Sequence, residues 1–419
     1  MVGTRTHDEG AMGEDVATRP TWPAVTYESL PWRSSHEELA LVSKRARRRV
    51  ASTFRAAVPA QIADASLALP PELAERISAL EGDLARFDTR QEARGYDLPA
   101  LLLRSESAAS SQIESLTSSV RNVAWAELSD RAPHNARLIA GNVAAMRTAL
   151  ALPDELTIEG IQDIHRSLMA PTGELFGGNL RDEQVWVGGT GVSPHGALFV
   201  PPQPARVRAC LDDLVTFSRR DDLNPLAKAA VLHAQFETIH PFIDGNGRTG
   251  RTLLHKVLRR DGVLETSALP VSAGLLHDID AYMAAIRRYQ AGDPLPMVER
   301  VVDALASALL IGSLVATAVD GVLTGWRASL TARRGSSILR LPDVLVEQPV
   351  VSSAFLAQRL GITVRAANDV LNKACDLGIL RPIGDARRGI FYQADALIAI
   401  LEEVSGAPEI RRVLARGSL

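Results

Sequence analysis

Residues 240–251, which read HPFIDGNGRTGR, constrain the fold of this chain more than any other stretch. Residues 225–239 carry apolar side chains at helical spacing, and Pro241 disfavours helix at the residue before it, so that helix should end at His240. The glycines within residues 245–247 allow unusual backbone angles, and a helical pattern resumes directly after them. The stretch therefore predicts two helices joined by a tight loop that opens onto the second helix.

This loop combines the residue types that a polyphosphate site requires. Free N–H groups at a helix start, together with the helix dipole, favour an anion such as phosphate. Arg248 and Arg251 lie three apart, hence on one helix face, and both carry forked donors for phosphate oxygens. Asp244 is a suitable ligand for Mg²⁺, which usually binds one or two carboxylates plus substrate phosphates. His240 is then available as a general base.

Other interpretations of these residues have less support. His240 alone would fit a helix-capping histidine, and Asn-Gly is a frequent turn dipeptide, but the neighbouring aspartate and paired arginines favour the phosphate site. No G-x-x-x-x-G-K-[ST] sequence occurs around these residues, which excludes a Walker-type loop. His233 and His240 are seven apart and lack the H-E-x-x-H spacing, so zinc hydrolysis is not indicated.

The stretch resembles the signature of the Fic family, H-P-F-x-[DE]-G-N-G-R-x-x-R, and every fixed position is met. The resemblance implies Mg²⁺-dependent transfer of AMP from ATP to a Ser, Thr or Tyr hydroxyl of a target protein. In that reaction His240 deprotonates the hydroxyl and Asp244 holds Mg²⁺. The phosphate contacts implied by the resemblance come from Gly245, Asn246, Gly247, Arg248 and Arg251.

A second motif lies in the helical pattern of residues 99–120. In the Fic family an inhibitory helix carries [ST]-x-x-x-E-[GN], and the run from Ser110 to Glu114 resembles it, although Ser115 replaces Gly or Asn. By this resemblance Glu114 pairs with Arg251 and keeps it from the γ-phosphate. Because this helix precedes the signature, the chain resembles the class with an N-terminal inhibitory helix. An ordinary surface glutamate is the alternative.

Residues 173–204 are rich in Gly and Pro and contain the β-leaning pieces EQVWVGG and ALFVPP. This composition predicts a β-hairpin on a helical body. It resembles the family's flap, which binds the target segment as an added strand beside the active site. Trp186 and Val187 are the expected flap residues. A purely structural hairpin is the alternative.

The C-terminal part has its own pattern, with a short helix, a turn at Gly361, a second helix from Thr363 and two strands around a turn. This order resembles a winged helix-turn-helix. Such a domain suggests DNA binding, and the expected contacts are Arg365, Asn368, Arg387 and Arg388. Protein docking or dimer spacing is the alternative role.

Composition limits the class of protein. A net charge of −3 over 419 residues gives no indication of a surface that coats nucleic acid. Cys210 and Cys375 lie far apart without metal-ligand spacing, which predicts a reducing compartment, and with no evident secretory leader we expect the cytoplasm. The uncharged stretch between Asp303 and Asp320 is shorter than a comfortable membrane span, so it predicts a buried helix and no membrane partner.

We therefore predict a mainly α-helical Fic core with a β-hairpin flap and a C-terminal winged-helix domain. The expected regions are a mobile arm at 1–33, a helical region with the inhibitory helix at 34–130, the catalytic core at 131–325 and the winged helix at 341–401. Other activities stay open: transfer of another phosphate-containing group, removal of AMP by the same site, or nucleotide sensing by a DNA-binding regulator. Fic-type cores often pair, so the resemblance also implies a homodimer.

Overall fold

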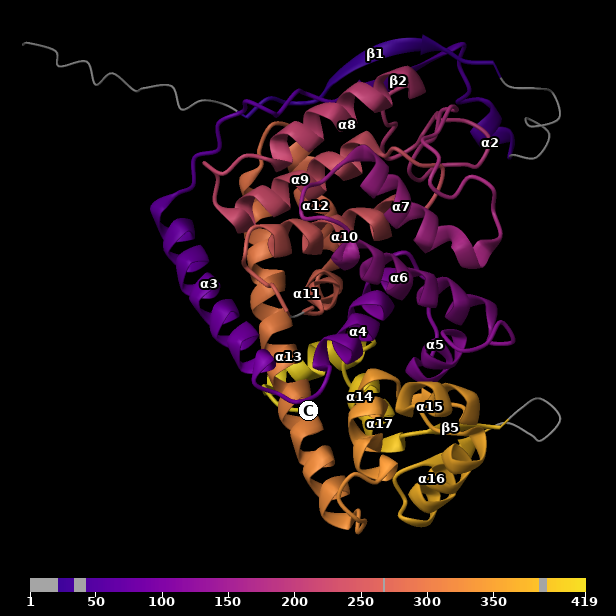
Figure 1. Ribbon diagram of the computed structural model, residues 1–419. Helices are drawn as coiled ribbons and strands as arrows, with labels where there is room; N and C mark the ends of the chain where they lie inside the picture. Colours follow the sequence, from indigo (N-terminus) through magenta and orange to yellow (C-terminus); the bar gives the residue numbers. More distant parts are fainter. Residues whose placement is uncertain (1–21, 34–42, 267, 384–389) are drawn as a thin grey trace, which may run out of the picture.

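The structure is a computed structural model that describes residues 22–33, 43–266, 268–383 and 390–419. It is mainly helical, with a larger upper body and a smaller C-terminal body below it (Figure 1). The helices of the upper body are α2 (Lys44–Arg47), α3 (Pro71–Glu92), α4 (Leu98–Ile113), α5 (Val120–Ala126), α6 (His134–Ala151), α7 (Ile158–Met169), η1 (Ala170–Thr172), α8 (Pro204–Ser218), α9 (Pro225–Ile239), α10 (Asn246–Arg260), α11 (Val271–His277), α12 (Ile279–Gln290) and α13 (Leu295–Ser329).

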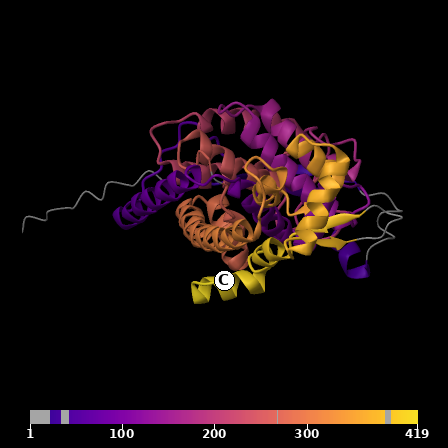
Figure 2. The ribbon, with the colours of Figure 1, turned by 60° about the horizontal axis from the view of Figure 1, so that its bottom comes forward.

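Helices α9 and α13 form the centre of the upper body. Nearly all of α9 is buried, because α8, α10, α12 and α13 all contact it. Helix α13 runs from within the upper body to the lower end of the molecule (Figures 1 and 2) and also contacts α3, α11 and the C-terminal body. By length and composition alone α13 could cross a membrane, but half of its most apolar 18-residue stretch is buried inside the protein. The predicted buried helix between Asp303 and Asp320 lies within it.

The N-terminal region differs from the prediction. Residues Thr26–Pro31 form β1, which pairs antiparallel with β2 (Thr53–Val58), so the predicted arm is wrong for residues 22–33 and the next region is not purely helical. Residues 1–21 lie outside the described residues. This two-stranded sheet also depends on a contact distant in sequence, because Ala57 N–H in β2 donates to the carbonyl of Val200 at 2.9 Å. Local composition does not contain that information.

The predicted flap is also less regular than a β-hairpin. Two isolated antiparallel bridges, Val187 with Phe199 and Thr190 with Ser193, join its two sides, and neither side forms a longer strand. Gly188 and Gly189 both have left-handed φ values, 75° and 78°, which interrupt an extended strand.

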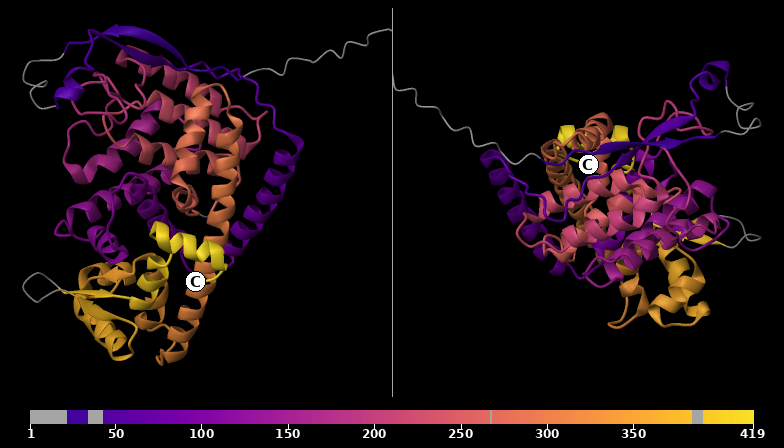
Figure 3. Two further views of the ribbon diagram at one scale, coloured as in Figure 1. Left: turned by 180° about the vertical axis from the view of Figure 1, so that it is seen from behind. Right: turned by 90° about the horizontal axis from the view of Figure 1, so that it is seen from above.

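The smaller body begins at η2 (Ser337–Arg340) and continues through α14 (Leu341–Glu347), β3 (Val350–Val351), α15 (Ser353–Leu360), α16 (Val364–Asp376), β4 (Arg381–Ile383), β5 (Phe391–Gln393), α17 (Asp395–Glu402) and α18 (Ala407–Arg416). Its strands form an antiparallel sheet in the order β3-β5-β4. The elements follow the predicted order, and their assignment as a winged helix stays a prediction. Helix α18 extends beyond the predicted boundary and returns to contact α11 and α13 (Figure 3).

Of the four residues predicted to contact DNA, two can be placed. Arg365 and Asn368 are exposed on α16, and Ser353 Oγ donates to the side-chain oxygen of Asn368. Arg387 and Arg388 lie outside the described residues.

Candidate active site

The loop predicted to hold phosphate begins where α9 ends. The side chain of Asn224 caps the start of α9, and the helix stops at His240, whose φ of 50° is left-handed. Pro241 follows, and a residue before proline is disfavoured in the right-handed helical region. Gly245, with φ 75°, is then the N-cap of α10. The predicted arrangement of two helices joined by a tight loop is confirmed.

Two buried side chains fix the shape of this loop. Asn246 accepts from Phe242 N–H and donates to Phe242 C=O, both at 2.9 Å, so its side chain closes the loop and only its backbone can contact phosphate. The ring of His165 stacks on Phe242 at 3.7 Å between centroids. Gly178 N–H donates to His165 Nδ1, so the Nε2–H donates to the carbonyl of Asp244 at 3.0 Å. Burial lowers the pKa of His165 to about 4, which keeps this neutral tautomer at neutral pH.

His240 has the protonation state that a general base requires. It lines the cavity, and burial lowers the pKa of its imidazole to about 4, so the ring is neutral at physiological pH. Its Nδ1 lies 3.3 Å from the backbone carbonyl of Glu237 and donates there. The Nε2 lone pair of His240 therefore remains available to accept a proton.

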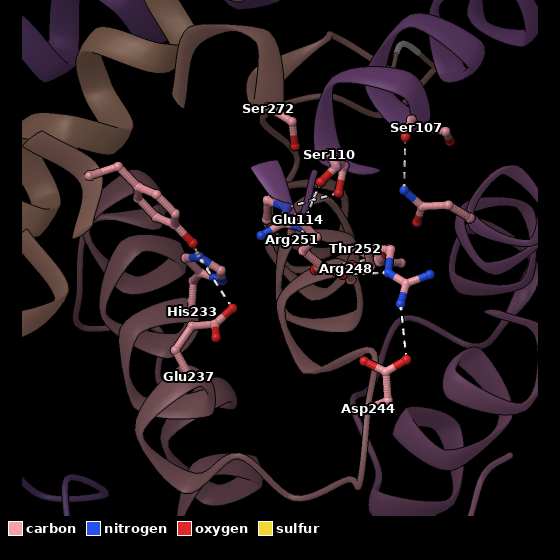
Figure 4. A network of polar contacts seen from close by, with 12 residues as sticks. Ser107, Ser110, Glu114, His233, Glu237, Asp244, Arg248, Arg251, Thr252 and Ser272 are labelled. Carbon is pink, nitrogen blue, oxygen red and sulfur yellow. Dashed lines mark hydrogen bonds and ion pairs between the residues drawn. The ribbon is translucent and has the colours of Figure 1, made fainter. Parts of the chain in front are cut away.

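The carboxylate of Glu114 bridges both arginines of the signature. Its Oε2 accepts from Arg248 Nε at 2.7 Å, and its Oε1 accepts from an Arg251 terminal nitrogen at 2.8 Å (Figure 4). Arg251 also donates to the Oγ and the backbone carbonyl of Ser110, both at 2.8 Å. Although burial opposes it, the charge of Glu114 raises the pKa of Arg251. The predicted contact with Arg251 is present, and the equal contact with Arg248 was not predicted.

The same carboxylate lies over the start of α10. A Cβ at Gly247 would lie 2.6 Å from Glu114 Oε1, so the missing side chain is what allows the carboxylate to approach this helix start. The first N–H groups of a helix have no intrahelical acceptor and favour an anion. The surrounding cavity has a volume of about 590 Å³, within the usual range for ligand sites. The position is therefore an anion site that a side chain of the same protein fills.

Asp244 fits the predicted metal role when phosphate is present. Its side chain is 62% exposed and lines the cavity, and Arg248 lies 3.5 Å away. In the described part of the chain, no cluster of three or more His, Cys, Asp or Glu could hold a metal ion alone. A Mg²⁺ ion at Asp244 would thus need phosphate oxygens and water to complete its coordination, as is usual for this ion.

The flap forms the cavity's outer wall. Trp186 and Val187 both line the cavity, and the Trp186 indole N–H donates to the carbonyl of Thr190 at 2.6 Å. Leu198, also in the wall, is 83% exposed. The two predicted flap residues therefore lie beside the signature loop.

Sequence reasoning missed one end of the cavity. Met283, Ile286 and Gln290 of α12 line it together with Glu237, one turn before His240 on α9. Burial raises the pKa of Glu237 to about 7, and its Oε1 has no hydrogen-bond partner. The spacing of 283, 286 and 290 marks one helix face, but nothing in the sequence connects that face with the signature.

Comparisons with known proteins agree with this geometry. The chain is 30% identical over 183 residues to protein adenylyltransferase fic-1 of Caenorhabditis elegans, covering 42% of this chain and 33% of that protein. It is 36% identical over 111 residues to protein adenylyltransferase Fic of Drosophila willistoni, covering 26% and 20% respectively. The chain thus spans a third or less of these relatives' length.

A solved structure of a Fic family protein from Desulfovibrio desulfuricans has the same fold, with a TM-score of 0.51 and 21% identity over 78% of this chain and 97% of that one. Residues 155–258, from the start of α7 to the end of the signature helix, match the Fic/DOC family. The similarity to the Fic/DOC family therefore lies in this segment, which contains the whole signature loop.

Proposed function

We propose that this protein transfers AMP from ATP to a hydroxyl side chain of a target protein and that Glu114 holds the site inactive. The main support is the Glu114 carboxylate, which lies over the start of α10 and bridges Arg248 and Arg251. An anion of the protein thus takes the place that favours a phosphate. The names of the relatives, which are protein adenylyltransferases, support the same reaction.

The reaction would use the residues as follows. The target hydroxyl oxygen bonds to the α-phosphorus while the bond from this phosphorus to the α–β bridging oxygen breaks, and pyrophosphate leaves. The hydroxyl proton passes to Nε2 of His240, which is free because Nδ1 donates to a backbone carbonyl. The N–H groups at the start of α10 and the two arginines bind the phosphate oxygens. A Mg²⁺ ion on Asp244 would neutralise phosphate charge.

Two other parts of the cavity have roles in this proposal. The flap residues Trp186 and Val187 border its outer side and would hold the target segment near His240. The apolar side chains of Met283 and Ile286, which line the cavity, would contact the adenine ring, and Gln290 beside them would offer an amide to its edge.

The test uses purified protein, ATP labelled at the α-phosphate and a cell extract. Because Glu114 blocks the arginines, the parent for the assay is the Glu114→Gly variant. We expect label on protein with this variant and none with the Glu114→Gly/His240→Ala double variant. Equal labelling by both variants would contradict the proposed base, and no labelling by either would contradict the proposed reaction.

A separate proposal concerns α16, where Arg365 and Asn368 are exposed and three residues apart, hence on one helix face. We propose that this face contacts DNA. Arg365→Ala should then weaken DNA binding and reduce its salt dependence, whereas Arg411→Ala on α18 should not. Equal binding by the parent and both variants would contradict DNA contact through α16.

A further inference from the structure

Arg181 is a buried cation whose hydrogen-bond acceptors in the described part of the chain are backbone carbonyl oxygens. Arg181 is 3% exposed, and no carboxylate among the described residues forms an ion pair with it. Its guanidinium donates instead to the backbone carbonyls of His240 at 2.8 Å, Glu183 at 3.1 Å and Pro202, with a longer contact to Ile239. A buried cation without a counter-ion costs free energy, so such an arrangement needs a reason.

One half of this set holds the end of α9. The carbonyls of a helix's last turn have no intrahelical partner, and a cation there is favourable. The backbone of His240 is in the left-handed region, which residues other than glycine rarely adopt. Arg181 donates directly to the carbonyl of this residue. In addition, the backbone N–H of Arg181 donates to the carbonyl of Pro241 at 3.0 Å. Arg181 thus fixes the backbone at the proposed base.

The other half holds the two ends of the flap. Glu183 lies just before the flap's first bridge and Pro202 just after its last, and one guanidinium binds both carbonyls. The same planar group therefore joins the flap to the residue proposed to take the proton. Because a guanidinium is rigid, it sets the separation of the backbones that it joins.

We propose that Arg181 is a positioning residue that fixes His240 relative to the flap, and so sets the distance between the base and the target hydroxyl. This inference rests on the proposed AMP transfer. Arg181 does not line the cavity, so its effect on the reaction comes through His240 and the flap.

The chain contains a matched control, Lys256 on α10. It is also a buried cation, 4% exposed, and its Nζ donates to the carbonyls of Ala149 at 3.1 Å, Leu152 at 3.4 Å and Pro153 at 2.8 Å. These acceptors lie in the last turn of α6 and directly after it, and they are not part of the cavity wall. Replacing Lys256 therefore removes a comparable set of hydrogen bonds without touching His240 or the flap.

The experiment compares Arg181→Met, Arg181→Lys and Lys256→Met, each in the Glu114→Gly protein, for ATP affinity, turnover and melting temperature. We expect Arg181→Met to lower turnover by about 100-fold, because a misplacement of about 1 Å has effects of that size, with ATP affinity within about threefold. The turnover of Arg181→Lys, whose side chain can reach fewer carbonyls, should lie between that of Arg181→Met and that of the parent. Lys256→Met should lower the melting temperature and keep turnover within about threefold.

A second readout does not depend on AMP transfer. Burial lowers the pKa of His240 most, the hydrogen bond to the Glu237 carbonyl raises it, and the charge of the Arg181 guanidinium lowers it further. NMR titration should therefore show a higher His240 pKa in Arg181→Met and no change in Lys256→Met. If the Glu114→Gly parent transfers no AMP, the proposed function is wrong and the titration alone decides on Arg181. The proposal is overturned if both Arg181 variants keep the turnover and the His240 pKa of the parent. It is also overturned if Lys256→Met loses as much turnover as the Arg181 variants do. If Arg181→Met does not fold, Arg181→Lys carries the turnover test, and Arg181→Gln, which also lacks the charge, carries the titration.

Discussion

The two ends of helix α4 lie in different environments. At its C-terminal end, Glu114 is 25% exposed and bridges two arginines in the wall of the cavity. In its N-terminal half, Arg104 is 2% exposed and pairs with Glu127, which is 8% exposed. Arg104 also donates to the C-terminal body, to the carbonyl of Glu347 at 2.7 Å and to Gln348 Oε1 at 2.9 Å. One end is therefore accessible and the other is enclosed.

The enclosed half has further anchors. Glu106 accepts from the backbone N–H and the hydroxyl of Ser272 at the start of α11, and Ser105 Oγ donates to the carbonyl of Val404 at 3.4 Å. Withdrawing the whole helix would break all of these contacts, whereas removing the carboxylate from both arginines requires only the movement of Glu114, with Arg251 still bound to Ser110. We therefore expect inhibition to be relieved at the last turn of α4, with the N-terminal half in place.

The largest expected effect is at the accessible end. Glu114→Gly frees both arginines from charge-assisted hydrogen bonds, each of about 1.5–3 kcal/mol, so AMP transfer should rise by roughly 100-fold or more. Glu114→Gln keeps one acceptor oxygen and loses the charge, so its rate should lie between that of Glu114→Gly and the wild type. The measurement is initial rate with labelled ATP. A rate in Glu114→Gly equal to the wild-type rate would show that this carboxylate is not inhibitory.

The enclosed end should affect stability instead of rate. Arg104→Met leaves Glu127 buried with only the partly exposed Arg147 at 2.8 Å, so the free energy of unfolding should fall by about 3–5 kcal/mol. Transfer by the protein with Glu114 intact should stay within about threefold of the wild type. Chemical denaturation and the initial rate are the two measurements. A rise in rate approaching that of Glu114→Gly would show that the whole helix moves.

The sequence predicted the accessible end well because its chemistry is local. Residues 240–251 contain the base, the carboxylate, the glycines and both arginines within one loop, and the structure brings all of them to one cavity. Glu114 was found through a short motif, and the structure explains why that motif has Gly or Asn at its last position: Ser115, which stands there in this chain, has φ 64°, where Gly or Asn is favoured.

The enclosed end was not predictable in the same way. Arg104 contacts residues more than 200 positions later in the chain. Strand β1 pairs with β2, whose Ala57 N–H donates to the carbonyl of Val200 at the end of the flap. Such contacts depend on how distant elements meet, which local composition does not contain. The polar residues of α4 even favour an exposed helix, yet Arg104, Ser105, Glu106 and Ser107 are all buried.

A smaller effect concerns Glu237, which lies near the accessible end. Burial raises the pKa of its carboxyl from 4.5 to about 7, Arg251 opposes this and Glu114 adds to it. The folded protein therefore keeps a proton that the unfolded chain releases between about pH 4.5 and 7, so stability present below this window is lost as the pH rises through it.

Glu237→Gln removes this titration. Between pH 5 and pH 8 the wild type should lose up to about 3 kcal/mol more unfolding free energy than the variant. Denaturation at the two pH values measures the difference, with Glu72→Gln on the exposed side of α3 as control. Parallel pH profiles for the wild type and Glu237→Gln would mean that Glu237 is ionised throughout this range.

The smallest expected effect tests which part of α4 rearranges when Glu114 leaves the arginines. Ser115 is exposed and left-handed, so Ser115→Gly should relieve backbone strain and stabilise the fold by about 0.5–1 kcal/mol, whereas Ser115→Ala keeps the strain and should not. If the last turn must rearrange to free the arginines, the Gly variant should also lower basal AMP transfer by about two- to fivefold. If Glu114 leaves by rotating its side chain alone, Ser115→Gly raises the melting temperature and leaves basal transfer unchanged. Melting temperature and basal rate, measured on both variants, therefore separate release by the turn from release by the side chain.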